Sequence, residues 1–241
     1  MITKTNGLNK SGKSSLILLL LRLIDPLPAC AKGITIDGVC LDSVARTEVR
    51  DRIIALSQDP VFLPGHVSLR RQLDPLGLST AEDCHAVLQL VGLTELANGA
   101  ADLESPLRPS SLSGGQRSLF NVARTVLRGR VRSGRGSGGK AGGLLLLDEL
   151  SASLDGETER IIHRVVMDEF ADYTIITVSH RLEMILDFDT VLVLDRGRLV
   201  ERGSPRALAV DARSHFGQLW LAAGHKAPEE SVAGTGVRIG P

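Results

Sequence analysis

The stretch "GLNKSGKS", Gly7 to Ser14, constrains the fold of this chain more than any other part of the sequence. It contains a glycine, four variable residues, a second glycine, a lysine and a serine, and an apolar run follows it. The backbone N–H groups of such a loop converge on an anion at a helix N-terminus, where the helix dipole also favours negative charge. Lys13 would reach the β- and γ-phosphates of a nucleotide, and Ser14 would give its hydroxyl to Mg²⁺. Taken by itself, the pattern also fits a glycine-punctuated helix start with a chance lysine.

The chain on either side of this loop predicts a helix but no strand. A phosphate-binding loop normally follows a buried strand, yet only the short polar segment "MITKTN", Met1 to Asn6, precedes this one. Such a segment is a poor substitute for a buried strand. After the loop we expect a helix from Lys13 to Ile24, which Asp25-Pro26 ends because a residue before proline disfavours helix.

Strand patterns occur on both sides of a central helical region. "GITIDG" predicts a short strand with turn chemistry at Asp37-Gly38, and "IIALSQD" from Ile53 predicts another. A helical pattern from Gly156 to Glu169 separates two later strands, and strand, helix, strand implies a parallel sheet covered on both faces. The later strands are "LLLL" from Leu144, "YTIITVS" from Tyr173 and "TVLVL" from Thr190, and "DRGRLVERG" then predicts a turn and a short strand. The fold class is therefore α/β.

A helical subdomain is expected between about residues 70 and 130. "STAEDCHAVLQLVGL" offers Ser79 as N-cap with Glu82 three residues on, and it ends near Gly92. "SGGQRSLFNVARTVLRG" has a broad apolar stripe at helical spacing, with Gly129 available at its C-terminus.

Two segments are predicted to be flexible. Residues 128–143, "RGRVRSGRGSGGKAGG", are glycine-rich and basic without periodicity, which favours a surface insertion. A nucleic-acid-binding arm is the alternative for this insertion, but aromatic stacking residues are missing from it. Residues 221–241 contain few large apolar side chains and are expected to form a disordered tail, so that one domain covers residues 1–220.

The composition narrows the classes of function. At 241 residues the chain can bury one sizeable core, and 28 basic side chains balance 28 acidic ones, so no overall field favours nucleic acid or an anionic membrane. The three cysteines lack metal-ligand spacing, and we assign them no chemistry. The longest apolar run, Leu16 to Leu21, is far shorter than the roughly 20 residues that a transmembrane helix needs. No secretory leader is recognised at the start, so secretion is not expected.

Two further motifs carry chemistry. "LLLLDEL" is an apolar strand that ends in Asp148 and Glu149, and a carboxylate at that edge can hold Mg²⁺ while its neighbour orients water. Alone, it could equally be a strand running into an acidic turn. "LSGGQR", from Leu112, gives a second exposed helix N-terminus that phosphate can approach closely, although an ordinary serine cap at Ser113 has the same pattern.

With these motifs in this order, the sequence resembles the nucleotide-binding domain of ATP-binding cassette (ABC) proteins. The resemblance implies a P-loop NTPase core of parallel strands with an inserted helical subdomain. It rests on six segments: "GLNKSGKSS" as Walker A, Gln58 in "SQDP" as the Q-loop, "LSGGQR" as the signature, "LLLLDE" as Walker B, "SASLD" as the D-loop and His180 in "TVSHR" as the switch. "LRRQLDPLG" and "SHRLEMILDFDTVLVLDRGRLVERGSP" look like the second cassette of C-subfamily exporters, the multidrug-resistance-associated type.

The resemblance also implies a role for each matching position. Glu149 would be the general base or water-positioning carboxylate, with His180 and Gln58 as further catalytic residues. Mg²⁺ would be held by Ser14, Gln58 and Asp148. ATP would be bound by Gly7, Leu8, Asn9, Lys10, Ser11, Gly12, Lys13, Ser14 and Ser15. Ser113, Gly114, Gly115, Gln116 and Asp155 would serve the site of a second nucleotide-binding domain in a head-to-tail dimer.

The chain also departs from the family pattern. An antiparallel subdomain that carries the adenine-stacking aromatic residue precedes Walker A in the family, and it is largely missing here. Lys10 lies where glycine is usual, which costs on the order of 1 kcal/mol if the position needs a positive φ; alternatively, its ammonium could add a phosphate contact. We therefore expect the C-terminal portion of an exporter, separated from its membrane domains, which binds ATP more readily than it hydrolyses it.

The leading hypothesis is an ATPase that drives transport, with transmembrane domains as partners, no nucleic acid partner, and a location on the cytoplasmic face of a membrane. The alternative is a truncated nucleotide-binding fragment without turnover. A soluble ABC ATPase acting on DNA or ribosomes fits less well, because no sustained heptad pattern occurs and only one cassette is present.

Overall fold

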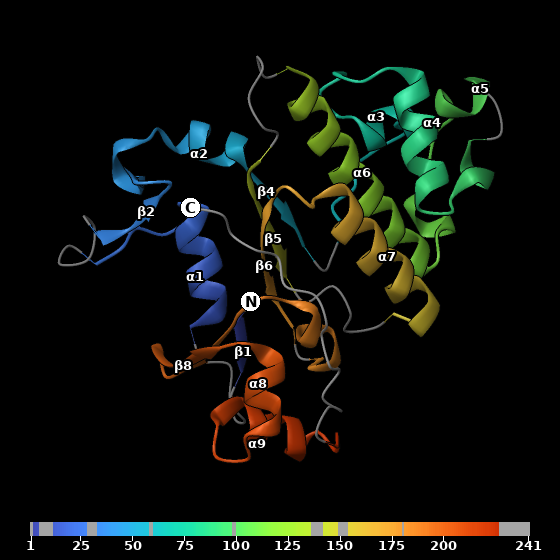
Figure 1. Cartoon of the computed structure of the whole chain (residues 1–241). Coiled ribbons are helices and arrows are strands. Elements are labelled where there is room, and N and C mark those ends of the chain that lie inside the picture. Colours follow the sequence, from blue (N-terminus) through green and yellow to red (C-terminus); the bar gives the residue numbers. More distant parts are fainter. Residues whose placement is uncertain are drawn as a thin grey trace, which may run out of the picture. The chain divides into compact units, whose positions relative to one another are not determined.

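A computed structural model describes residues 2–4, 12–27, 33–57, 60–97, 100–135, 142–148, 154–179 and 181–226 (Figure 1). The described residues divide into two compact units. Residue 2 and residues 13–181 belong to the first unit, and residues 3, 4, 12 and 182–226 belong to the second.

A parallel sheet forms the centre of the first unit. Its strands β4 (Ile53–Leu56), β5 (Leu144–Asp148) and β6 (Thr174–Val178) lie side by side with β5 in the middle. Leu56 is opposite Leu147, and Asp148 is opposite Val178. The four leucines of β5 are all buried, as expected for a strand covered on both faces. The predicted strand–helix–strand unit and its parallel sheet are therefore confirmed.

The prediction that no strand precedes the loop is wrong. Strand β1 (Ile2–Lys4) runs parallel to β6, with Ile2 opposite Val178. Sequence patterns detect strands through side chains, whereas this pairing uses backbone groups along β6 that accept a partner of any composition. The predicted phosphate-binding loop therefore does follow a strand.

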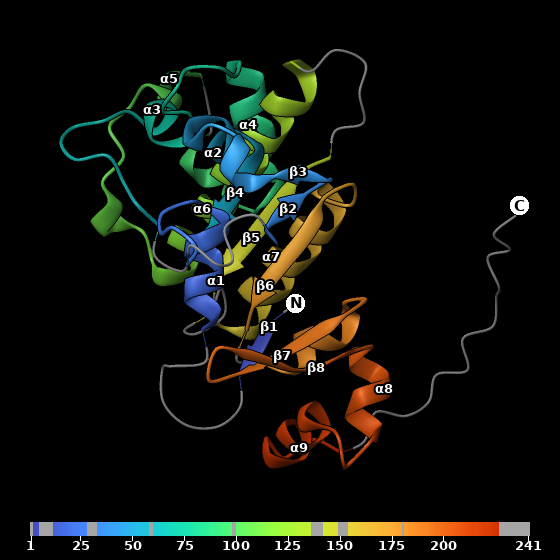
Figure 2. The ribbon, with the colours of Figure 1, turned by 90° about the vertical axis from the view of Figure 1, so that its left-hand side faces the viewer.

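Helices cover both faces of this sheet. In Figure 1, α6 (Gly114–Arg135) and α7 (Gly156–Glu169) lie on one side of the strands and α1 (Lys13–Leu20) lies on the other. Figure 2, turned by 90°, shows α1 in front of the sheet. Ile162, Val165 and Val166 of α7 belong to the buried core, and the bounds of α7 agree with those predicted.

Helix α1 ends earlier than predicted, at Leu20 instead of Ile24. Arg22 takes a left-handed conformation with φ of 50°, and the N–H of Leu23 donates to the carbonyl of Leu18 at 2.8 Å. This is a Schellman ending, which usually has glycine at the left-handed position. The guanidinium of Arg22 donates to the carbonyl of Val44, so tertiary contacts hold a residue type that sequence alone would not place there.

A small antiparallel hairpin and a short helix follow α1. Strands β2 (Thr35–Ile36) and β3 (Val39–Cys40) are joined by Asp37 and Gly38, with φ of 51° and 76°. Two positive φ values define a type I′ turn, as the Asp-Gly pair predicts. The 3₁₀ turn η2 (Leu41–Ser43) and helix α2 (Arg46–Arg52) lead into β4.

Short helices pack on α6 to form the predicted helical subdomain. They are α3 (Leu69–Leu73), α4 (Ala81–Leu90) and α5 (Ala100–Leu103), with 3₁₀ turns η3 (Thr94–Leu96) and η4 (Pro109–Ser111). Their core is continuous with that of the sheet; its fully buried side chains include Leu73, Leu88, Leu93, Leu103 and Phe120.

The N-cap of α4 is Thr80 and not Ser79, which corrects the sequence prediction. The Thr80 hydroxyl accepts from the Asp83 N–H, and the Asp83 carboxylate accepts from the Thr80 N–H. Ser79 is buried and donates its hydroxyl to the Asp74 carboxylate at 2.5 Å. Both residue types are good caps, so burial decided between them.

Helix α6 does not end at Gly129 but continues to Arg135. A Cβ atom at Gly129 would lie 2.9 Å from Cε1 of Phe170, so the glycine permits close packing instead of ending the helix. Residues 128–135 of the predicted flexible insertion are therefore helical. Residues 136–141 of the same predicted insertion lie outside the described residues.

The second unit contains an antiparallel strand pair and two helices. Strand β7 (Val191–Asp195) pairs with β8 (Arg198–Gly203), as "DRGRLVERG" predicts. The 3₁₀ helix η5 (Glu183–Asp187) and helices α8 (Pro205–Val210) and α9 (His215–Ala222) complete it.

The predicted tail begins too early, because the Trp220 indole N–H donates to the carbonyl of Lys226 at 2.6 Å. Residues 227–241 lie outside the described residues. Within the described part of the chain, no helix has the length and apolar content to cross a membrane.

Candidate functional site

The carboxyl ends of β4, β5 and β6 meet at one edge of the sheet, because the three strands are parallel. Ser57, Asp148 and Ser179 are the last described residues there. Gln58, Glu149 and His180 come next in the sequence, and they lie outside the described residues. The fold thus brings to one edge the three segments that lead into the predicted catalytic residues.

The structure describes the end of the predicted phosphate-binding loop, from Gly12 onward, and the start of α1. Gly12 has a φ of 93°, a value that favours glycine, and a Cβ there would lie 3.4 Å from Cα of Gly197. Lys13 is 7% exposed, whereas Ser14 and Ser15 are exposed in the first turn. First-turn N–H groups lack intrahelical acceptors and can bind an anion. Residues 7–11 of the predicted loop lie outside the described residues.

Of the predicted magnesium ligands, the structure describes Ser14 and Asp148. Asp148 is half-buried as the last residue of β5. Among the described residues, no three His, Cys, Asp or Glu side chains gather as a metal site. Mg²⁺ bound with a nucleotide needs only one or two carboxylates besides phosphate oxygens and water. A single carboxylate at this strand end therefore fits the predicted ion.

The predicted signature forms the N-terminus of α6. The Ser113 hydroxyl accepts from the N–H of Gln116 at 3.1 Å, and the Gln116 side chain accepts from the N–H of Ser113 at 2.9 Å. This reciprocal pair is a capping box. Ser113 and Gly114 are exposed. The cap fixes the backbone while leaving the start of the helix accessible to another molecule.

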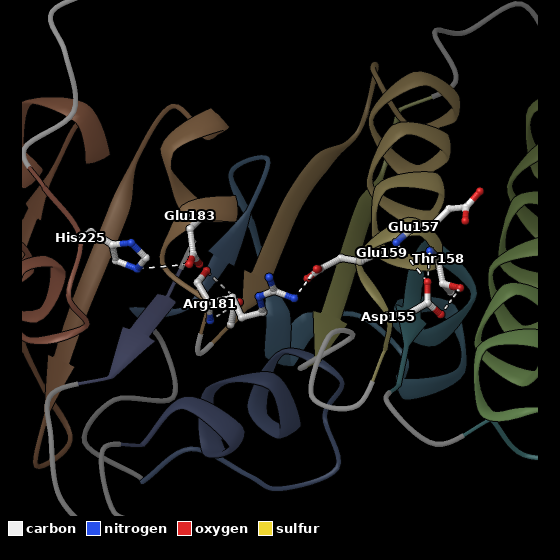
Figure 3. Close-up of polar contacts among 8 residues, drawn as sticks. Asp155, Glu157, Thr158, Glu159, Arg181, Glu183 and His225 are labelled. Atoms are coloured by element: carbon white, nitrogen blue, oxygen red, sulfur yellow. Dashed lines mark hydrogen bonds and ion pairs between the residues drawn. The ribbon is translucent and has the colours of Figure 1, made fainter.

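Asp155 forms the N-cap of α7, close to the signature. Its carboxylate accepts from the N–H groups of Glu157 and Thr158 at 3.0 and 2.9 Å (Figure 3). These bonds, led by the Thr158 N–H and hydroxyl, hold the pKa of Asp155 below its usual value. A Cβ on Gly115 would lie 3.1 Å from Oγ1 of Thr158, which is a tight contact at the place where α6 and α7 begin side by side.

An ion pair that the sequence did not indicate secures the residues around His180. The Arg181 N–H donates to the Ser179 hydroxyl at 2.9 Å, and the Arg181 guanidinium pairs with Glu159 of α7 (Figure 3). Glu159 is 8% exposed, and its Oε1 has no hydrogen-bond partner among the described residues. No local pattern predicts this pair, because the two residues are far apart in the sequence.

A parallel sheet with the Gly12-Lys13 helix start and a carboxylate at the end of a core strand is the arrangement of a P-loop NTPase fold. Residues 2–131 match the family described as "ABC transporter". The chain belongs to this family.

Curated relatives and a solved structure agree with this assignment. The chain is 49% identical to the ABC transporter FGM5 of Gibberella zeae, over 89% of this chain and 14% of that protein. It is 45% identical to the ABC-type transporter braE of Annulohypoxylon truncatum, over 91% and 15% of the two chains. A bacterial Atm1-family ABC exporter with ATP bound is 27% identical, with a TM-score of 0.73 over 95% of this chain and 37% of that one. The chain therefore spans about 14% to 15% of the length of these two curated relatives.

Proposed function

We propose that this chain binds ATP and hydrolyses it as a nucleotide-binding domain of an ABC exporter. The observation that carries the proposal is the shared sheet edge, to which the fold brings Asp148 and the segments that lead into Gln58, Glu149 and His180. The ATP-bound exporter to which the chain is similar supports the choice of nucleotide.

Lys13 and the backbone of residues 7–15 hold the triphosphate. A lysine with little exposure at the start of a helix can meet phosphate oxygens without competition from bulk water. Ser14, Gln58 and Asp148 hold Mg²⁺, which, when bound, neutralises charge on the phosphates. Glu149 orients the attacking water or accepts its proton, and His180 contacts the γ-phosphate.

A second nucleotide-binding domain completes the site. The exposed N-terminus of α6, with Ser113, Gly114, Gly115 and Gln116, faces the nucleotide of the partner domain in a head-to-tail dimer. Asp155 lies beside Gly115 and communicates between the two sites. Phosphoryl transfer depends on positioning and charge stabilisation, so hydrolysis requires both halves.

The exporter is of the C-subfamily type, in which this chain corresponds to the second cassette. Transmembrane domains are its partners, and they place it on the cytoplasmic face of a membrane. The fungal transporters to which the chain is similar support this context.

Titration calorimetry of the purified chain with Mg-ATP tests the proposal. We expect saturable binding that Lys13→Ala abolishes, while the exposed Lys226→Ala control binds as the wild type does. Phosphate release that Glu149→Gln abolishes would establish hydrolysis. If the folded wild type fails to bind ATP at millimolar concentration, the proposal is wrong.

A further inference from the structure

Two side chains of helix α6 donate hydrogen bonds to the backbone on both sides of residues 58–60. The Asn121 side-chain amide donates to the carbonyl of Ser57 at 3.0 Å. One turn further, the Arg124 guanidinium donates through Nη1 to the carbonyl of Val61 at 2.6 Å. These two carbonyls flank the segment that contains Gln58. Gln58 and Asp59 themselves lie outside the described residues.

The far side of that segment is held at three consecutive residues. Val61 is bound by Arg124, and the ring of Phe62 stacks on Phe120 with centroids 5.5 Å apart. The Leu63 N–H donates to the side-chain oxygen of Gln72 at 2.9 Å, and the Gln72 amide donates back to the Leu63 carbonyl at 2.9 Å. Gln72 is fully buried, so its amide serves the backbone in the way that a neighbouring strand would.

Arg124 joins these contacts into one network. Besides Val61, it donates through Nε to the carbonyl of Gln72 at 3.0 Å. Its guanidinium carbon lies 5.6 Å and 5.4 Å from the ring centroids of Phe62 and Phe120. Burial lowers the pKa of Arg124, and its Nη2 is buried without a hydrogen-bond partner among the described residues. Burying the Arg124 guanidinium is costly unless its hydrogen bonds are made. Its contacts therefore favour one position of the two backbone carbonyls that it binds.

We propose that Asn121 and Arg124 are positioning residues for Gln58. They act through the carbonyls of Ser57 and Val61, which lie between the end of β4 and the start of the helical subdomain. The inference rests on the proposed function, because Gln58 is assigned there as a magnesium ligand. Loss of either side-chain hydrogen bond, that of Asn121 or that of Arg124, would weaken magnesium-dependent binding of the nucleotide. The contacts of Lys13 with the phosphates would stay intact.

Calorimetry of ATP with the full chain tests this, once with Mg²⁺ and once with EDTA. The measured quantity is the ratio of the two dissociation constants. This ratio is the dissociation constant in EDTA divided by that with Mg²⁺. We expect Asn121→Ala and Arg124→Lys to lower it by roughly tenfold, as the loss of a residue that orients a metal ligand does. ATP affinity in EDTA should not change. The double variant Gln58→Ala/Asn121→Ala should lose no more than Gln58→Ala alone, because residues that act as a unit are not additive.

Arg128→Lys is the matched control. Arg128 also lies on α6 and donates to a backbone carbonyl, that of Arg50 at 3.1 Å, but this carbonyl precedes β4 instead of following it. The Arg128→Lys variant should keep the wild-type ratio of dissociation constants. An unchanged ratio in Asn121→Ala, or full additivity with Gln58→Ala, would overturn this inference but not the proposed function. A wild type that gains nothing from Mg²⁺ would overturn the proposed function as well. If Arg124→Lys fails to fold, the Asn121→Ala comparison decides.

Discussion

At the scale of single residues, the ion pair between Arg181 and Glu159 joins α7 to the segment after β6. The Glu159 side chain is 11% exposed and the Arg181 side chain is 44% exposed. We expect Arg181→Met to destabilise the fold by about 1 to 3 kcal/mol, because the carboxylate stays buried without its partner. Urea unfolding of the wild type and the variant measures this free energy.

A second substitution separates loss of the charge pair from loss of packing. In the Arg181→Met background, Glu159→Gln should recover part of the stability, because an unpaired amide costs less to bury than an unpaired carboxylate. If Arg181→Met unfolds at the wild-type urea midpoint, the pair does not stabilise the fold.

Asp74 makes stability depend on pH. Burial raises its pKa, but the hydroxyl and N–H of Ser79 and further backbone N–H groups donate to the carboxylate, and the net result is a pKa below the usual value. A lowered pKa in the folded state stabilises the protein above the ordinary aspartate pKa of about 3.9, and this stability is lost as the pH falls through the lowered value. Asp74→Asn should therefore be less stable than the wild type at pH 7.

The difference between the two proteins should shrink as the pH falls below about 4, because the unfolded wild type then binds a proton that the folded carboxylate binds only at its lower pKa. Urea midpoints measured from neutral pH downward test this trend. A gap that stays constant over the whole range would contradict it.

At the scale of elements, Gly129 shows how packing overrides helix propensity. Alanine in a helix interior normally gains roughly 0.5 to 1 kcal/mol over glycine. At Gly129, however, the new Cβ would meet the buried ring of Phe170, so we expect Gly129→Ala to lose about 1 to 3 kcal/mol in unfolding experiments. Gly134→Ala on the same helix is the control, because a Cβ there has nothing within 4 Å and should be neutral or stabilising. Equal effects at the two sites would show that the ring moves aside.

At the scale of the whole molecule, the proposed function predicts association that depends on ATP. Glu149→Gln should bind ATP without turning it over, and so it should accumulate as a head-to-tail dimer with the nucleotide between the copies. Light scattering should show a monomer without nucleotide and a dimer with Mg-ATP. Adding Ser113→Arg should prevent the dimer while leaving binding of ATP to the monomer intact, because Ser113 is exposed at the start of α6 and lies outside the proposed ATP-binding loop. A variant that binds ATP and stays monomeric at high concentration would contradict the two-domain site.

Several features of the fold were determined by the sequence alone, because they depend on neighbours along the chain. The run of leucines from Leu144 predicts a strand buried on both faces, Gly156 to Glu169 predicts α7, and Asp37-Gly38 predicts the hairpin turn. The site motifs are local in the same sense. Lys13, Asp148 and Ser113 occupy the helix start, strand end and helix start that their motifs indicate, whereas Gln58, Glu149 and His180 stay predictions, because they lie outside the described residues.

Only the tertiary structure decided the features that depend on residues far apart in the sequence. β1 exists because β6 supplies backbone partners, and Gly129 is a glycine because Phe170 packs against it. The hydrogen bonds of Asn121 and Arg124 to Ser57 and Val61 join residues about 60 positions apart. Local patterns record propensity and periodicity, whereas such contacts arise only when packing brings distant backbone groups within hydrogen-bonding distance.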